Sequence, residues 1–469
     1  MNKFYITTPI YYVNAKPHIG HAYTTIAADV LARFYRQQLG KENVFFLTGT
    51  DEHGQKIQKV AESAGKNPQE FTDEIVAHFK ELWDKLDIKY DNFIRTTDES
   101  HKKAVQKVLQ TLYDNGAIYK GEYEGLYCIG CEQFKNESDL VDGKCPDHNI
   151  VPELIKEESY LLKLTELQPE LIKKIESDEF KLTPEKYKKE ILSFLKNQTL
   201  RDVSISRKNV SWGIPLPFDP THTTYVWADA FLNYLTGLDW DGNEKKMPKF
   251  WPADVQLIGK DILRVHATIW PAMLMHLGVE LPKILFTHGH ILSGGKKMSK
   301  TLGNAILIDE MLEIFGTDGT RYLLLSAGTF GEDVDATMER LVEKYNADLA
   351  NGLGNLVSRT LKLSEKISIK IGTENHGLYT EDIVNNPEIG KAIDFVWNNI
   401  KNLNKYIEDN KPWELAKTDT IKFEDVMNKL VHGLYDISEA LMPFMPETSE
   451  KIKKALETKE SVALFPRIK

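Results

Sequence analysis

The sequence predicts an α/β fold: a doubly wound parallel sheet, interrupted by an inserted domain and followed by a C-terminal α-helical bundle. Strand-like and helical patterns alternate over residues 1–118 and again over 223–290, which predicts the sheet. Between 119 and 222, turn residues, cysteines and lysine-rich helices replace the alternation, which indicates an insertion. After about residue 340 the pattern is helical throughout, which predicts the bundle.

The first half of the sheet begins with a buried strand at residues 4–8. A helix is expected over 19–39, because apolar side chains recur there at helical spacing and Gly40 is a natural stop. A second apolar run at 44–48 is typical of a strand. Ligands of such sheets bind beyond the carboxyl ends of the strands, so the loops after these two strands are candidate binding loops. Further helices are expected at about 55–64, 69–86 and 100–115.

The second half of the sheet resumes at residue 223, with strands expected at 255–258 and 284–286. Residues 291–345 carry a glycine- and lysine-rich loop. We expect them to form a region of their own before the helical domain at 346–469. Within that last part, helical patterns lie near 341–370, 387–409 and 424–442.

Composition excludes several classes of protein. The 469 residues suffice for about three domains, and a hydrophobic fraction of 42% allows real cores. The net charge of −10 gives no sign of nucleic acid, although a basic stripe can lie on an acidic protein. Three cysteines and an N-terminus without a secretory or transit segment argue against a disulfide framework and predict a cytoplasmic protein. No stretch reaches the apolar length of a membrane span.

The first candidate loop contains Pro17-His18-Ile19-Gly20-His21, at the start of the helix over 19–39. A helix N-terminus offers unpaired N–H groups and a positive dipole end, and the two imidazoles add donors. Gly20 has no Cβ, so a flat ring can pack on its backbone. Together these residues suit ATP, with the adenine on Gly20 and the phosphates on His18 and His21. The alternative is a pair of capping histidines without a ligand.

A separate candidate loop, within residues 291–345, is Lys296-Lys297-Met298-Ser299-Lys300-Thr301, preceded by Ser293-Gly294-Gly295. Lysines on a glycine hinge can neutralise a triphosphate. The gain is largest in a transition state, where negative charge builds on leaving pyrophosphate. The alternative is a solvated basic turn, which is common for lysine runs.

All three cysteines lie in two short motifs, Cys128-Ile129-Gly130-Cys131 and Cys145-Pro146-Asp147-His148. Each pair brackets a tight turn, so three sulfurs and one imidazole can converge on a tetrahedral ion. Four protein ligands would close the coordination shell, which predicts one structural Zn²⁺ per chain. The alternative is three buried free thiols.

Taken together, the His-Ile-Gly-His and Lys-Met-Ser-Lys loops resemble the signature motifs of class I aminoacyl-tRNA synthetases. Four surrounding segments, 8–14, 48–54, 225–230 and 258–262, look like those of the methionyl-tRNA synthetases, and the similarity runs from residue 4 to Arg467. Thr301 departs from the serine of many class I enzymes but keeps the hydroxyl. The resemblance implies a Rossmann-type catalytic domain in two halves, 1–118 and 223–290. It also implies a connective domain with a zinc knuckle at 119–222, a loop and stem-contact region at 291–345, and an anticodon-binding helical domain at 346–469.

The resemblance also implies roles for individual residues. ATP would be bound by His18, Gly20, His21, Gly259, Asp261, Lys297 and Lys300, of which the histidines and lysines would be catalytic. Methionine would be bound by Ile10, Tyr12, Asp51, Arg207, Trp227, Ala230, Tyr234, Ile262, His266 and Trp270. Asp51 would hold the substrate ammonium, and Arg207 would pair with the substrate carboxylate or with the network of Asp51. A thioether packs well against aromatic rings, although plain core packing is the alternative for each aromatic residue.

The anticodon would be read in the helical domain by Asn355, Arg359 and Trp413. The first two are four residues apart and so share a helical face, where an amide and a guanidinium can read base edges. An indole can stack on an unstacked base. The alternative for Trp413 is a residue of the bundle core.

The expected reaction has two steps. Methionine attacks Mg²⁺-bound ATP to give methionyl-adenylate and pyrophosphate. The terminal adenosine of tRNA(Met), initiator tRNA included, then takes the methionyl group and AMP is released. The alternatives are a leucine- or cysteine-type synthetase, and a nucleotidyltransferase-like or RNA-binding protein without aminoacylation. Because the sequence ends after the helical domain, a monomer is expected unless a separate protein supplies a further tRNA-binding domain.

Overall fold

The computed structural model describes residues 2–135, 137–146, 149–298, 306–365, 367, 388–460 and 463–469. The chain forms two compact units. The sheet unit comprises Met1–Pro17, Leu39–Asp84 and Lys89–His288, and the helical unit comprises His18–Gln38, Lys85–Ile88 and Gly289–Lys469. In the described part of the chain, no helix combines the length and the apolar character needed to cross a membrane.

The sheet unit is built on a parallel sheet, as the sequence predicted. Its strand order is β2-β3-β1-β12-β13-β8, and β4 also pairs with β3. Every pairing in this sheet is parallel. The strands are β1 (Phe4–Thr7), β2 (Tyr11–Tyr12), β3 (Val44–Asp51), β4 (Asn92–Arg95), β8 (Lys181–Thr183), β12 (Val255–Gly259) and β13 (Ile284–His288).

The core of this unit lies between the sheet and its helices. Tyr5, Leu47, Ile258 and Leu285 are almost completely buried, as expected for parallel strands covered on both faces. The Tyr5 hydroxyl donates to the carbonyl oxygen of Tyr234 at 2.7 Å, which satisfies a polar group inside this core. The helices and 3-10 turns are η1 (Lys41–Asn43), α2 (Gln55–Ser63), α3 (Pro68–Lys85), α4 (Glu99–Asp114), α7 (Val226–Ala230), α8 (Asn233–Thr236), η4 (Lys260–Ile262) and α9 (Leu263–Leu277).

The segment expected as an insertion divides into two parts. One is an antiparallel sheet of order β6-β5-β7-β9, in which β5 and β7 pair from Ile118↔Leu162 to Tyr127↔Glu153. The other continues the parallel sheet, because β8 pairs with β13 and is flanked by α5 (Gln168–Glu176) and α6 (Glu185–Asn197). The remaining elements are β5 (Ile118–Cys128), β6 (Gln133–Lys135), η2 (Glu137–Asp139), β7 (Glu153–Leu162), η3 (Thr165–Leu167), β9 (Val203–Ser204), β10 (Ser206–Arg207) and β11 (Thr223–Thr224).

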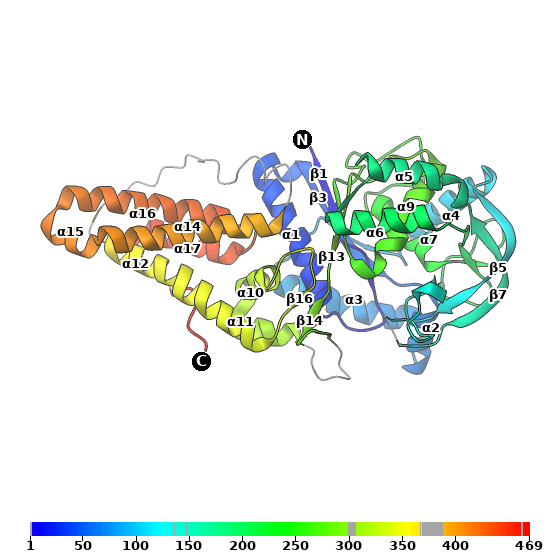
Figure 1. Ribbon diagram of the computed structural model, residues 1–469, viewed down its shortest axis with the longest axis horizontal. Coiled ribbons are helices and arrows are strands. Elements are labelled where there is room, and N and C mark those ends of the chain that lie inside the picture. Colours follow the sequence, from blue (N-terminus) through cyan, green and yellow to red (C-terminus); the bar gives the residue numbers. More distant parts are fainter. Residues whose placement is uncertain are drawn as a thin grey trace. The chain divides into compact units, whose positions relative to one another are not determined.

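The helical unit combines one long N-terminal helix with the C-terminal bundle. Figure 1 shows α12, α14, α16 and α17 running alongside one another, and residue contacts join each neighbouring pair. The unit contains α1 (Ile19–Leu39), α10 (Ile308–Ser326), α11 (Met338–Lys344), the π-helical η6 (Tyr345–Gly354), α12 (Asn355–Ser364), α14 (Ile389–Asn410), α15 (Pro412–Thr418), α16 (Thr420–Leu441) and α17 (Pro446–Thr458). A small sheet of β15 (Lys296–Lys297), β14 (Ile291–Ser293) and β16 (Val334–Asp335) precedes the bundle.

A buried arginine ties α1 into this unit. Arg321 of α10 is completely buried and donates to Asp29 Oδ2 of α1 at 2.7 Å. Its other N–H groups donate to the carbonyl oxygens of Leu86, Pro443 and Phe444 at 2.9–3.0 Å. Because both charges are paired and hydrogen-bonded, removing either one would leave the other buried and uncompensated. The N-terminal helix is thereby fixed against α10 and the turn before α17.

Candidate functional site

The carboxyl edge of the parallel sheet collects several predicted residues. Ile10 follows β1, and Tyr12 in β2 lies directly opposite Asp51 at the end of β3. Gly259 ends β12, and Asp261 follows it in η4. The structure therefore brings residues from distant parts of the sequence to the edge where parallel sheets bind ligands.

An aromatic cluster lies on α7, α8 and α9. The ring of His266 meets Trp227 edge-on at 5.9 Å between centroids and Phe231 at 5.0 Å, and Phe231 stacks on Trp270 at 5.8 Å. Tyr234 lies 6.0 Å from His266 and 5.7 Å from Trp270. Phe231 was not among the predicted residues. Its spacing of four after Trp227 and three before Tyr234 is the helical signal that could have found it.

Hydrogen bonds fix the protonation of His266. Nδ1 lies 2.9 Å from the carbonyl oxygen of Ile262, which can only accept, so Nδ1 carries the proton. Nε2 therefore accepts from the Tyr234 hydroxyl at 2.8 Å. Burial lowers the pKa of His266 to about 4, and burial raises the pKa of Tyr234. Both side chains are uncharged at neutral pH, which suits an apolar ligand.

Asp51 is the most unusual group at the sheet edge. One of its carboxylate oxygens, Oδ1, is buried without a hydrogen-bond partner among the described residues. Burial, and then the nearby carboxylates of Asp229 and Glu132, raise the pKa of Asp51 well above its ordinary value. The indole Nε1 of Trp227 is likewise buried without a partner among the described residues. Buried polar groups are normally satisfied, so this open acceptor and donor are candidates for contacts with a ligand.

A buried network of one carboxylate and two histidines supports α7. Asp229 Oδ2 lies 2.7 Å from His53 Nδ1, and Oδ1 lies 2.7 Å from His101 Nε2. Burial alone would raise the pKa of Asp229, but the two imidazoles lower it. His101 also contacts Thr236 Oγ1 at 2.7 Å. Sequence reasoning missed this network, although His53 and Asp229 lie in two of the segments that carried the resemblance.

Arg207 has an ion-pair partner that the sequence did not suggest. Its Nε lies 3.0 Å from Glu157 Oε1, and its guanidinium carbon lies 4.2 Å from the ring centroid of Tyr127. Among the described residues no hydrogen bond or ion pair joins it to Asp51. Arg207 lies on β10, which contacts β7 of the antiparallel sheet.

The three cysteines converge as the spacing predicted. The Sγ atoms of Cys128, Cys131 and Cys145 all lie within 4.8 Å of one another, and Cys131 and Cys145 are 3.5 Å apart. All three are free thiols. Three sulfurs at such separations fit the edges of a tetrahedral thiolate site. The fourth expected ligand, His148, lies outside the described residues.

In the helical unit, the two histidines at the start of α1 are held as a pair. Their rings stack at 3.8 Å between centroids, and Nδ1 of His18 accepts from the Gly20 N–H at 3.1 Å. Nδ1 of His21 accepts from the His18 N–H at 3.2 Å. Since both Nδ1 atoms accept, each neutral ring carries its proton on Nε2 and can donate it to an anion. A Cβ at Gly20 would come 3.0 Å from His18 Cε1, so the His18 ring itself rests on this glycine.

The second loop is described only in part. Lys297 ends β15, whereas Lys300 and Thr301 lie outside the described residues.

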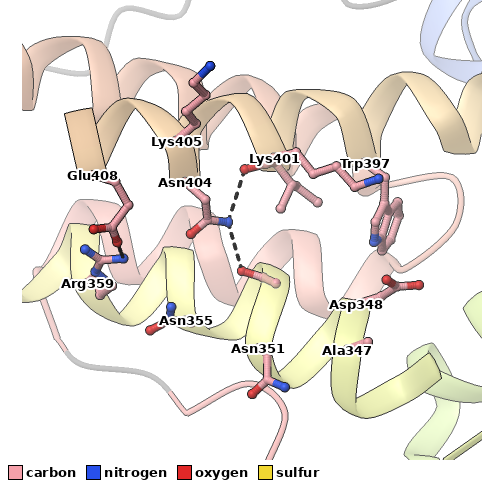
Figure 2. A pocket seen from close by; sticks show the side chains of 12 residues that line it. Ala347, Asp348, Asn351, Asn355, Arg359, Trp397, Lys401, Asn404, Lys405 and Glu408 are labelled. Carbon is pink, nitrogen blue, oxygen red and sulfur yellow. Dashed lines mark hydrogen bonds and ion pairs between the residues drawn. The ribbon is translucent and has the colours of Figure 1, made fainter. Parts of the chain in front are cut away.

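A pocket of about 420 Å³ opens between η6, α12 and α14 of the helical unit, and Asn355 and Arg359 both line it (Figure 2). Arg359 Nη1 lies 2.6 Å from Glu408 Oε1, and its guanidinium carbon lies 5.5 Å from the ring centroid of Trp413. Trp413 is 38% exposed, so it is not a core residue. The three predicted residues therefore share one surface, and Glu408 is an additional member that the sequence did not suggest.

Comparisons with known proteins identify the family of this chain. The family model described as tRNA synthetases class I (M) matches residues 4–151 and 148–361. The methionine–tRNA ligase of Clostridium acetobutylicum is 47% identical over 99% of this chain and 75% of its own length. That of Clostridium tetani is 47% identical over 99% of this chain and 76% of its own length.

A solved structure gives the same result at the level of the fold. Methionyl-tRNA synthetase of Mycobacterium tuberculosis, in complex with methionyl-adenylate, superposes with a TM-score of 0.90 at 35% identity, covering 97% of this chain and 93% of the other. The match takes in the parallel sheet as well as the helical bundle. This chain therefore belongs to the methionyl-tRNA synthetases, within the class I tRNA synthetases.

Proposed function

We propose that this chain activates methionine with ATP to methionyl-adenylate and then transfers the methionyl group to the terminal adenosine of tRNA(Met), initiator tRNA included. The observation that carries the proposal is the unpaired, buried carboxylate oxygen of Asp51 at the carboxyl edge of the sheet. A cationic partner would stabilise the ionised form of this carboxyl, and the ammonium group of an amino acid supplies one.

The methionine side chain would lie against the aromatic cluster. The neutral pair of Tyr234 and His266 offers a polar but uncharged contact, and a polarizable sulfur packs well against rings such as Trp227. The remaining predicted residues would complete the pocket: Ile10, Tyr12, Ala230, Ile262 and Trp270. Arg207 stays a candidate: Glu157 lies at ion-pair distance, but Nε and Nη1 of Arg207 are buried without a hydrogen-bond partner among the described residues.

ATP would be held mainly by hydrogen-bond donors. The Nε2 atoms of His18 and His21 would contact its phosphates, Gly20 would back the adenine, and Gly259 and Asp261 would hold the ribose. Lys297 and Lys300 would stabilise the departing pyrophosphate, and Mg²⁺ would accompany the nucleotide. The methionine carboxylate is itself the nucleophile, so the protein contributes positioning and charge stabilisation.

The cysteine cluster, with His148, would hold one structural Zn²⁺. Its three sulfurs are the soft donors that zinc prefers, and a closed shell of four protein ligands leaves no position for substrate. The metal would therefore stabilise the turn that follows β5.

The domains would divide this work as the sequence suggested. Residues 1–118 and 223–290 would form the catalytic halves, 119–222 the connective domain, 291–345 the loop and stem-contact region, and 346–469 the anticodon-binding domain. Asn355, Arg359 and Trp413 would read the CAU anticodon, with Trp413 stacking on an unpaired base. We expect a monomer that acts in the cytoplasm.

Charging of tRNA transcripts with labelled methionine tests this function. A transcript with the CAU anticodon should be charged in an ATP-dependent reaction, and one with an altered anticodon should be charged far more slowly. Equal charging of both transcripts would refute the anticodon assignment, and no charging of either would refute the ligase function.

A further inference from the structure

Glu132 is a buried carboxylate that the proposed chemistry does not use. It follows Cys131 directly, is 5% exposed, and has a left-handed backbone with φ of 51°. Burial of a carboxylate is costly unless its oxygens are satisfied. Hydrogen bonds to its neighbours offset this cost. The same hydrogen bonds join the turn at Cys131 and Glu132 to the carboxyl edge of the parallel sheet.

The Glu132 carboxylate accepts from three groups. Oε1 accepts from the Tyr12 hydroxyl at 3.1 Å and from the backbone N–H of Lys56 at 2.8 Å. Oε2 accepts from the Tyr127 hydroxyl. Burial, and then the charge of Glu132, raise the pKa of Tyr12 well above its ordinary value, so the Tyr12 hydroxyl stays protonated and is the donor.

The space around the Tyr12 hydroxyl is closed by Gly54. A Cβ there would come 2.7 Å from the hydroxyl oxygen and 3.2 Å from Glu132 Oε1, and the φ of Gly54 is +111°. Any other residue would both clash and strain the backbone. The hydroxyl of Tyr12 is thus fixed between Gly54 and Glu132.

The backbone of Glu132 makes a second connection. Its carbonyl oxygen accepts from the Tyr225 hydroxyl. Tyr225 is the residue at the N-terminal end of α7, the helix that carries Trp227 and Ala230. Lys56 also donates from Nζ to the Gly130 carbonyl oxygen at 3.1 Å, which holds the turn from the other side.

We propose that Glu132 is a positioning residue for methionine binding, which sets the Tyr12 hydroxyl through its carboxylate and the start of α7 through its carbonyl oxygen. The inference rests on the proposed function, because Tyr12 and Trp227 are there assigned to the methionine pocket. Glu132 does not contact the substrate itself. Its loss therefore weakens methionine binding while the phosphate-binding groups stay as they are.

The test compares Glu132→Gln and Glu132→Ala with the control Glu153→Gln, an exposed glutamate of the same antiparallel sheet. Glu132→Ala should raise the KM for methionine about tenfold or more, since buried hydrogen bonds to a charged acceptor are lost. Glu132→Gln keeps the side-chain volume and one acceptor oxygen, so it should raise the KM for methionine less than Glu132→Ala does. The kcat and the KM for ATP should stay close to the parent values, and the control should match the parent throughout.

Two further measurements separate positioning from simple stability. Methionine binding, followed by tryptophan fluorescence without ATP, should weaken in parallel with KM. Tyr12→Phe should raise the KM in the parent but add little in the Glu132→Gln background, because the two changes remove the same interaction. Melting temperature and metal content, measured on the same samples, should stay near the parent values for Glu132→Gln.

The inference would be overturned, and the ligase function left intact, if Glu132→Gln and Glu132→Ala both fold and neither changes the KM for methionine. Additive effects of Glu132→Gln and Tyr12→Phe, or equal rises in KM for methionine and ATP, would also overturn it. Absence of methionine-dependent exchange in the parent protein would instead refute the proposed function on which the inference rests.

Discussion

The two units bind their proposed ligands with groups in opposite settings. In the sheet unit, Tyr234 and His266 are buried and Asp51 is partly buried. Burial and a fixed hydrogen bond set the protonation of Tyr234 and His266, and burial and nearby carboxylates raise the pKa of Asp51. In the helical unit, Asn355 and Trp413 are exposed, and Arg359 already has Glu408 as a partner. Methionine is thus bound by preorganised, desolvated groups, and the anticodon by an exposed surface. Substitutions of the methionine-binding groups should therefore cost more than those of the anticodon-binding surface.

Removing the charge of Asp51 should have the largest effect. Asp51→Asn keeps the shape but loses the partner of the substrate ammonium, so kcat/KM for methionine should fall roughly a hundredfold. The same variant should melt at a higher temperature at pH 7. The pKa of Asp51 is raised in the folded protein. Ionising this carboxyl therefore destabilises the ligand-free protein once the pH rises above the pKa of Asp51 in the unfolded chain, which is about 4. A lower melting temperature together with normal activity would contradict both assignments.

His266 should make stability depend on pH in the opposite direction. The pKa of His266 is about 4 in the folded protein and 6.5 in the unfolded chain. Its contribution to the free energy of unfolding is therefore fully present above pH 6.5 and is lost as the pH falls toward 4. The loss amounts to roughly 3 kcal/mol of unfolding free energy. Urea unfolding of the parent and of His266→Gln at pH 7 and pH 4.5 measures it. Equal losses in the two proteins would show that His266 is not responsible.

Trp413→Ala tests the surface of the helical unit. Loss of a stacking platform costs about 1–3 kcal/mol per base, so charging of tRNA should fall roughly tenfold to a hundredfold. Methionine-dependent exchange and melting temperature should hardly change, because Trp413 is 38% exposed and opens no cavity. Parallel loss of exchange, charging and melting temperature would mean that Trp413 only stabilises the bundle. Lys300→Ala is the converse variant, and should strongly reduce exchange while leaving tRNA affinity close to normal.

Glu408→Gln should have the smallest effect. Glu408 is mostly exposed, and exposed ion pairs contribute about 0–1 kcal/mol, so charging should change less than about fivefold. The expected direction is faster charging, because Arg359 is released from a carboxylate that competes with RNA. A large loss of charging would show that Glu408 itself contacts the tRNA.

Long periodic elements of this fold could be predicted from the sequence. The strand at residues 4–8, the helix at 19–39 and the bundle could be predicted because apolar residues recur along them in a regular pattern. The strand β8 was missed because Lys181–Thr183 is too short to show a period. Its pairing with β13 comes from contacts across the sheet, which no local pattern records.

The site was predictable to the extent that single motifs carried it. The cysteine spacing placed three thiols together, and the resemblance supplied Asp51 and the aromatic residues. The partners were not predictable, because they are far apart in the sequence. Asp229 meets His53 across 176 residues, and Glu132 meets Tyr12 across 120. The ion pair of Arg207 with Glu157 was not predictable either, since it depends on how the antiparallel sheet folds.

Amino-acid-dependent ATP–pyrophosphate exchange tests the central claim most directly, because it requires both the amino-acid pocket and the nucleotide site but no tRNA. With the standard amino acids supplied one at a time, methionine alone should support rapid exchange. Homocysteine, which lacks one methyl group, should be activated weakly, since such a difference gives only about 1–3 kcal/mol of discrimination. Rapid exchange with leucine or cysteine in place of methionine, or none with any amino acid, would contradict the account.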